Sequence, residues 1–131
     1  MILKLINKHT LEIDDFQFRC CIGKKGLTKN KKIKIFIQVN LGNEEQKNGI
    51  SLKNLGNFYK ECKTNLDLDI VGLMCLPPID KDPKKFFEEL KECSIKYNLP
   101  ELSMGMSGDF EIASKLGSTF VRIGSKIFGE R

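Results

Sequence analysis

From residue 33 onward, short apolar runs alternate with longer amphipathic stretches, and this alternation restricts the fold more than any other feature. Repeated βα units around a parallel sheet produce such a pattern, because each strand is followed by a helix that covers it. Strands buried on both faces are short and largely apolar. Four strands are predicted, at residues 33–39 (IKIFIQV), 69–75 (DIVGLMC), 102–106 (LSMGM) and 119–123 (TFVRI). The sequence thus predicts an α/β protein built from parallel βα units.

Three helices are predicted between these strands. Ser51 suits the N-cap of the first, Asp82 followed by Pro83 opens the second, and the third runs from about Asp109 to Gly117, a residue suited to a left-handed cap. Apolar residues at three- and four-residue steps should face the sheet. These are Leu52, Leu55, Phe58, Tyr59 and Cys62 in the first helix, Phe86, Phe87, Leu90, Cys93 and Tyr97 in the second, and Phe110, Ala113 and Leu116 in the third.

The first 32 residues do not continue this pattern and form an atypical basic segment. Glycines and paired cysteines interrupt any amphipathic helix there, and six lysines follow between Lys24 and Lys34. The net charge is +5, but no aromatic stacking pattern accompanies the basic run, so nucleic-acid binding is not expected. Five cysteines without a CxxC pair, and one histidine, predict neither a zinc site nor a disulfide framework. With no apparent signal peptide or membrane span, we expect a cytoplasmic protein.

Small and hydroxyl-bearing residues end the last two predicted strands. Residues 104–108 read MGMSG and residues 122–125 read RIGS. Backbone N–H groups beside small residues, at the start of a helical segment, suit a phosphate, and parallel βα proteins bind ligands at the carboxyl ends of their strands. The two loops are thus predicted to form one phosphate cup. The alternative is a pair of tight turns in which serine caps a helix.

Arg122 lies inside a predicted buried strand, where its charge is costly unless it meets an anion or an acceptor. A bound anion and an internal ion pair both satisfy this requirement. No nucleophile with a partnered base is found elsewhere. His9 stands alone, Cys75 beside Met74 reads as core, and the polar loop at residues 43–49 (NEEQKNG) reads as solvated.

The strings IFIQVN with NEEQKNG, IVGLMCLPP, LSMGMSGDFEIA and GSTFVRIGSKIFGER resemble those of the pyridoxal phosphate homeostasis proteins, the YggS-like family, over residues 33–131. Members resemble the barrel domain of alanine racemases. The resemblance implies the carboxy-terminal half of a TIM-like barrel that binds pyridoxal 5'-phosphate without catalysis. It also implies that Ser107, Gly124 and Ser125 hold the cofactor phosphate, that Arg122 faces the pyridine nitrogen, and that Met106 lines the pocket.

The family's first strand, which carries the lysine of the Schiff base, has no counterpart here. Residues 1–32 are therefore predicted to be an extension that is not family-like, in a truncated form of the protein, since 131 residues fall short of the roughly 200–250 of a full barrel. Open sheet edges predict self-association, pairing with a complementary fragment, or aggregation. A racemase-like enzyme, a basic interaction module and a non-functional fragment are the alternative functions. A racemase-like enzyme would need a catalytic tyrosine, and Tyr59 and Tyr97 are the only tyrosines in the sequence.

Overall fold

A computed structural model describes residues 4–7, 10–13, 34–42 and 49–129 of the chain. Its strands form one sheet in the order β1-β2-β3-β5-β6-β7, with the short β4 paired to β3. The strands are β1 (Lys4–Asn7), β2 (Thr10–Ile13), β3 (Lys34–Asn40), β4 (Ile50–Ser51), β5 (Asp69–Met74), β6 (Glu101–Met106) and β7 (Phe120–Arg122). The helices are α2 (Leu52–Thr64), α3 (Pro83–Lys96), α4 (Phe110–Lys115) and α5 (Ser125–Phe128).

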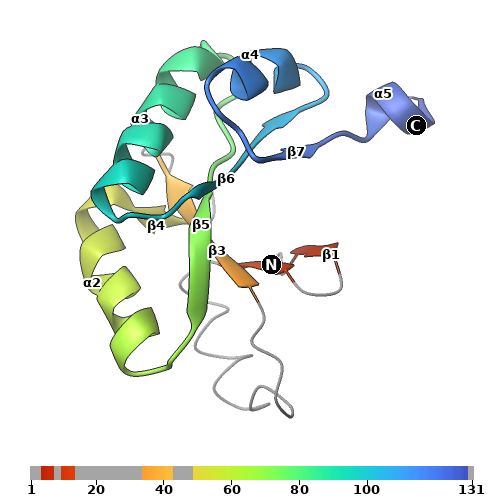
Figure 1. Cartoon of the computed structure of the whole chain (residues 1–131). Helices are drawn as coiled ribbons and strands as arrows, with labels where there is room; N and C mark the ends of the chain where they lie inside the picture. The colour runs from red at the N-terminus through yellow and green to blue at the C-terminus, as the bar shows by residue number, and fades with distance from the viewer. Residues whose placement is uncertain (1–3, 8–9, 14–33, 43–48, 130–131) are drawn as a thin grey trace.

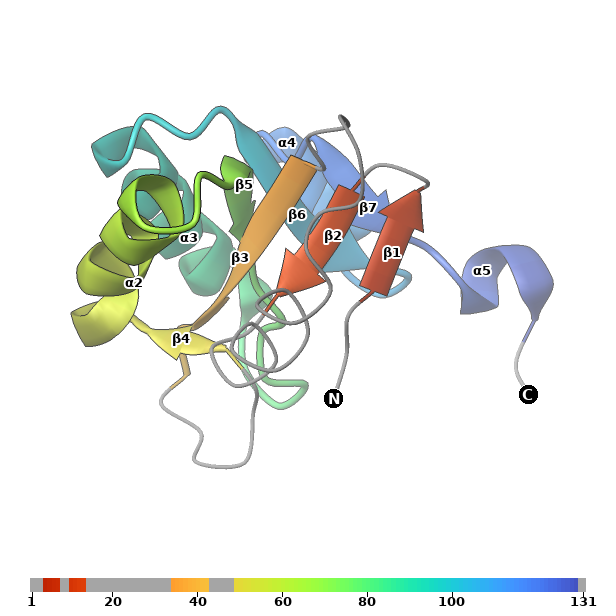
Figure 2. The ribbon, with the colours of Figure 1, turned by 90° about the horizontal axis from the view of Figure 1, so that it is seen from below.

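The sheet is parallel from β2 to β7, and β1 joins its edge antiparallel to β2. Neighbours in the sheet follow the order of the chain, as they do in a barrel, rather than reversing direction as in a doubly wound sheet. Helices α2 and α3 lie on the same face of the sheet (Figure 1). Figure 2 shows α5 standing apart from the sheet at the end of the chain. The prediction of parallel βα units forming part of a barrel is confirmed.

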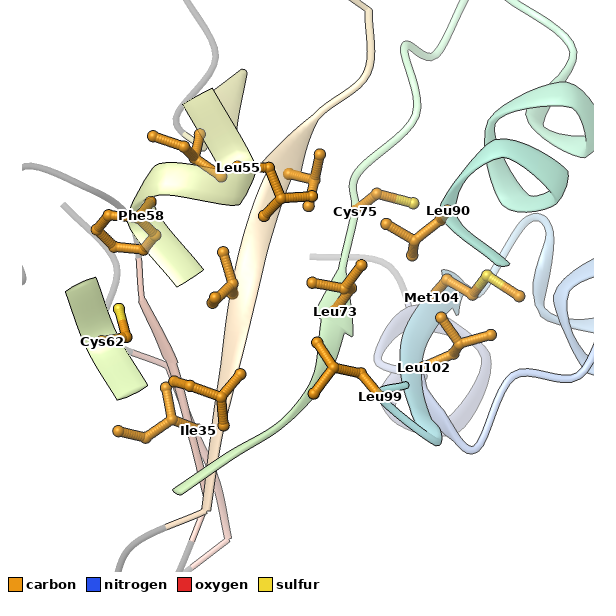
Figure 3. Packing of buried hydrophobic residues seen from close by; sticks show 14 of the residues in the cluster. Ile35, Leu55, Phe58, Cys62, Leu73, Cys75, Leu90, Leu99, Leu102 and Met104 are labelled. Atoms are coloured by element: carbon orange, nitrogen blue, oxygen red, sulfur yellow. The ribbon is translucent and has the colours of Figure 1, made fainter. Parts of the chain in front are cut away.

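The core fills the space between this face and the helices. Alternate residues of β3, Ile35, Ile37 and Val39, belong to the buried cluster, as the two-residue period of a strand requires. Leu55, Phe58 and Cys62 of α2 face the sheet, as does Leu90 of α3 (Figure 3). The opposite face carries a different set of residues, among them Phe36, whose ring meets Phe120 of β7 edge-on with centroids 5.2 Å apart.

The predicted helices all form, with differences at their ends. Asp82 caps α3 by accepting a hydrogen bond from the Lys84 N–H at 3.0 Å, as predicted. Gly117 follows α4 with φ +100°, and the Ser118 N–H reaches back to the Ala113 carbonyl, which makes a Schellman cap. Ser51 occupies the N-cap of α2, as predicted, without a side-chain hydrogen bond, and it also ends β4. The inward prediction for Leu52 was wrong, since its side chain is 38% exposed at the first turn.

The strand count was too low, because three short strands have no apolar run long enough to reveal them. Two of these, β1 and β2, come from the segment predicted to be atypical, and β2 pairs with β3 in parallel. The boundary drawn at residue 33 is therefore not an edge of the sheet. The basic run up to Lys32 and the polar loop at residues 43–48 lie outside the described residues, as do His9, Cys20 and Cys21.

Gly72 offers a test of strand packing. A Cβ at this position would lie 2.1 Å from the Glu101 carbonyl oxygen and 2.6 Å from Cε1 of Phe36, so β5 and β6 would have to separate. We expect Gly72→Ala to lower the free energy of unfolding in urea by about 2 kcal/mol, the scale of an overpacked core. Gly108→Ala is the matched control, since nothing lies within 4 Å of its added Cβ. Equal stability of the two variants would contradict the packing described here.

Candidate functional site

The two loops predicted to form a phosphate cup lie side by side at the carboxyl ends of β6 and β7. The strands pair there through Met106 and Arg122. Just beyond that pair, the Gly124 N–H donates to Oγ of Ser107 at 3.2 Å, across 17 residues of sequence. Ser107 is half-buried and Gly124 is exposed. The structure thus brings together one side-chain hydroxyl and one backbone amide from the two loops.

A tight turn fixes the loop that carries Ser107. The Met106 N–H donates to Oδ1 of Asp109 at 2.6 Å, and the Asp109 N–H donates back to the Met106 carbonyl at 3.1 Å. Gly105, with φ +96°, breaks the alternation of β6 before the turn, and a Cβ there would lie 2.6 Å from that of Ala113. The sequence identified Asp109 only as a helix start, although aspartate near glycine also favours such turns. The side chain of Asp109 therefore holds the loop in this turn.

Arg122 extends from β7 across two neighbouring strands. Its Nη1 donates to Oγ of Ser103 on β6 at 2.5 Å, and its Nη2 donates to the carbonyl of Cys75, directly after β5, at 3.0 Å. Ser103 lies between two residues of the helix-side core, so its side chain faces the opposite side of the sheet, as does the guanidinium. Both of these acceptors are uncharged. The arginine thus has acceptors of the kind that its sequence position requires, on that face of the sheet.

The other predicted site residues are exposed to solvent. The Met106 side chain is 46% exposed, and Ser125 is exposed at the start of α5. With four residues, α5 is too short for the substantial helix dipole on which the cup was partly predicted. No atom lies within 4 Å of a Cβ added at Gly108 or Gly124, so the backbone of both loops is open to a ligand. The cup therefore rests on backbone amides, Ser107 and the nearby cation.

Cys75 contributes its carbonyl, and its side chain is not a candidate nucleophile. The side chain is 1% exposed on the helix side of the sheet. Burial raises the pKa of the Cys75 thiol to about 12, and the positive charge of Arg122 only partly opposes this rise. The sequence interpretation of Cys75 as core is confirmed.

The two tyrosines lie at the other ends of the strands. The rings of Tyr59 and Tyr97 are 5.4 Å apart at a tilt of 57°. Both line a cavity of about 450 Å³ with Lys34 and Glu101, the first residues of β3 and β6. Neither tyrosine is therefore near Arg122. In the described part of the chain, no cluster of side chains suited to a metal ion is found, and no helix is long and apolar enough to span a membrane.

The sheet is parallel with its strands in chain order, and helices cover one face, which defines part of an α/β barrel. The arginine and the loop amide lie at the carboxyl ends of the strands, where barrels bind ligands, and form the candidate site. The family model described as the alanine racemase N-terminal domain matches residues 9–131. This chain belongs to that family. The match includes β2, within the segment that sequence reasoning set apart.

Curated relatives carry the name that the motifs predicted. The pyridoxal phosphate homeostasis protein of Aquifex aeolicus is 39% identical over 119 residues, which cover 84% of this chain and 52% of the relative. The human protein of the same name is 38% identical over 117 residues, which cover 77% of this chain and 42% of the relative. The predicted resemblance is confirmed. The chain spans about half the length of the curated relatives it matches.

Solved structures agree with the fold. A structure of PipY from Synechococcus elongatus without PLP superimposes with a TM-score of 0.77 at 24% identity. The match covers 92% of this chain and 61% of the PipY chain. A protein of unknown function from Bifidobacterium adolescentis gives a TM-score of 0.79 at 26% identity, over 92% of this chain and 53% of its own. PipY with PLP bound gives 0.62 at 27% identity, over 73% of this chain and 49% of its own.

The burial of Cys75 predicts its reactivity. Only the thiolate is alkylated, and a thiol with a pKa near 12 is ionised to the order of 10⁻⁴ at pH 8. We expect iodoacetamide at pH 8 to modify Cys93, which is half-buried, well before Cys75, as measured by peptide mass mapping over time. Both should react at similar rates in 6 M guanidinium chloride. Fast alkylation of Cys75 in the folded protein would show that the strand beside Arg122 is not packed as described.

Proposed function

We propose that this chain provides the phosphate-binding and ring-binding side of a pyridoxal 5'-phosphate site, in a cofactor-homeostasis protein without catalytic activity of its own. The observation that carries the proposal is the hydrogen bond between Gly124 N–H and Ser107 Oγ, with the guanidinium of Arg122 on the neighbouring strands. The relatives named pyridoxal phosphate homeostasis protein, and the PipY structure with PLP bound, support it.

The cofactor phosphate would lie between the two loops. Backbone N–H groups of Gly124 and Ser125 and the hydroxyl of Ser107 are donors of the kind that bind phosphate oxygens. The Gly124 amide already binds an oxygen atom, that of Ser107, which indicates that it points into the space between the loops. The open backbone at Gly108 and Gly124 supports close approach of a ligand. Met106 would line the adjacent side.

Arg122 would face the nitrogen of the pyridine ring. A fixed positive charge disfavours a proton on that nitrogen, so the bound ring stays neutral and withdraws electrons less strongly. When bound, the cofactor supplies a reactive carbonyl and a conjugated ring that accepts electrons. The arginine thus limits this chemistry, which supports a role in holding the cofactor.

Two further observations support the non-enzymatic assignment. A racemase needs an acid or base on each face of the substrate carbon, and tyrosine supplies one of them in the enzymes that the family resembles. Tyr59 and Tyr97 pack against each other at the amino ends of the strands, away from Arg122. Cys75, whose carbonyl accepts from Arg122, has a buried and protonated thiol.

We further propose that residues 33–131 correspond to the carboxy-terminal half of the relatives' barrel domain, with β2 as a further strand beside β3. The coverage of about half of each curated relative supports this proposal. The free thiols of Cys75 and Cys93 support a reducing compartment such as the cytoplasm.

Absorbance titration with pyridoxal 5'-phosphate tests the function. We expect binding by the purified chain, weakened about tenfold or more in Arg122→Ala and several-fold in Ser107→Ala, because each substitution removes a charged or hydrogen-bonding contact to the ligand. Borohydride treatment and mass mapping of the product will report whether any lysine is modified.

Two surface substitutions are the matched controls. Lys53→Ala on α2 removes a positive charge, and Ser114→Ala on α4 removes a hydroxyl, both from exposed positions. Neither should change the affinity. Binding that is insensitive to Arg122→Ala and Ser107→Ala would contradict the site, and no binding by the unaltered chain would favour a non-functional fragment.

A further inference from the structure

The contacts of Arg122 identify a residue that lies within a quoted motif but was not predicted to have a role. Ser103 is fully buried, with 0% of its surface exposed, and its Oγ accepts a hydrogen bond from Nη1 of the arginine. It is one of few buried polar side chains among the described residues. A buried hydroxyl lowers the stability of the folded state unless it makes such bonds.

The two acceptors of Arg122 differ in kind. One is the backbone carbonyl of Cys75, which is fixed by the course of β5 and β6, since the Cys75 N–H donates to the Ser103 carbonyl at 3.3 Å. The other is the side chain of Ser103. Two bonds from two different nitrogens fix the plane of a guanidinium, whereas one bond leaves it free to rotate. Of these two acceptors, the Ser103 hydroxyl is the one that a substitution can remove.

We propose that Ser103 is a positioning residue for cofactor recognition, which orients the Arg122 guanidinium toward the ring nitrogen. This inference rests on the proposed function. Ser103 itself contacts neither the phosphate nor the ring in this arrangement, and it acts through the arginine. Its contribution is to remove the rotational freedom of a long side chain before the ligand arrives, which is the usual source of gain from preorganisation.

A comparison of two ligands isolates this role. Pyridoxine 5'-phosphate carries the phosphate and the ring nitrogen but no aldehyde, so lysine chemistry does not enter. Its carbocyclic analogue, with C–H in place of the ring nitrogen, has the same shape and phosphate. We expect Ser103→Ala to weaken binding of the first ligand about tenfold by calorimetry and to leave binding of the second unchanged, since only the first uses the oriented arginine. Ser107→Ala should weaken both ligands equally.

Ser103→Thr and Ser103→Val form a second, matched pair. They have nearly the same volume and differ by the hydroxyl, so any cost of packing at this buried position is shared. Threonine should retain the preference for the ring nitrogen, and valine should lose it.

The outcomes separate the two proposals. Loss of the ring-nitrogen preference in alanine and valine, with its retention in threonine, supports the positioning role. If the unaltered chain binds pyridoxine 5'-phosphate and Ser103→Ala affects both ligands alike or neither, the positioning role is overturned and the binding function stands. If the unaltered chain binds neither ligand, the binding function itself is overturned, and the role of Ser103 with it.

Discussion

The hydrogen bonds of Arg122 hold a positive charge at the carboxyl ends of three neighbouring strands. A guanidinium on β7 bonds to Ser103 on β6 and to the carbonyl after β5, so it spans the sheet at the end where parallel βα proteins bind ligands. An arginine on the inner face of a barrel strand is stable only with such acceptors. The same bonds that satisfy the charge also direct it, and the site therefore depends on them for its stability and for its geometry.

The two faces of the sheet serve different purposes. The helix-side face is built from aliphatic residues and carries the packing energy of the domain, through residues such as Ile37, Leu73 and Met104. The other face carries Ser103, Arg122 and the Phe36–Phe120 pair, which correspond to the interior of a barrel. This chain covers about half of its curated relatives, which carry additional length that this half-barrel does not contain. The inner face thus carries the candidate site and is the side that a complete barrel encloses.

Much of the fold was predictable because its signals are local. Apolar runs define the four main strands, and Asp82 and Gly117 define helix ends through their own hydrogen bonds and backbone angles. The strands β1, β2 and β4 were missed because two to four residues carry too little periodicity. Their place depends on pairing, of β2 and β4 with β3 and of β1 with β2. Within the site, Ser107, Gly124 and Arg122 were predicted and are close together in the structure. Ser103 and Asp109 were missed as supporting residues, because such a role is visible only once β5, β6 and β7 lie side by side.

The bond between Ser107 and Gly124 restricts what the phosphate cup can gain from a ligand. In the cofactor-free chain the Gly124 amide is not an unsatisfied donor, since the serine hydroxyl accepts from it. A phosphate oxygen that takes this amide must replace an existing hydrogen bond, so only the difference between the two bonds adds to affinity. Under the proposed function, the charge of Arg122 and its effect on the ring then supply the larger share of recognition. A site that exchanges one hydrogen bond for another leaves most of the specificity to the cation beside it, in keeping with the proposed role of holding the cofactor rather than reacting with it.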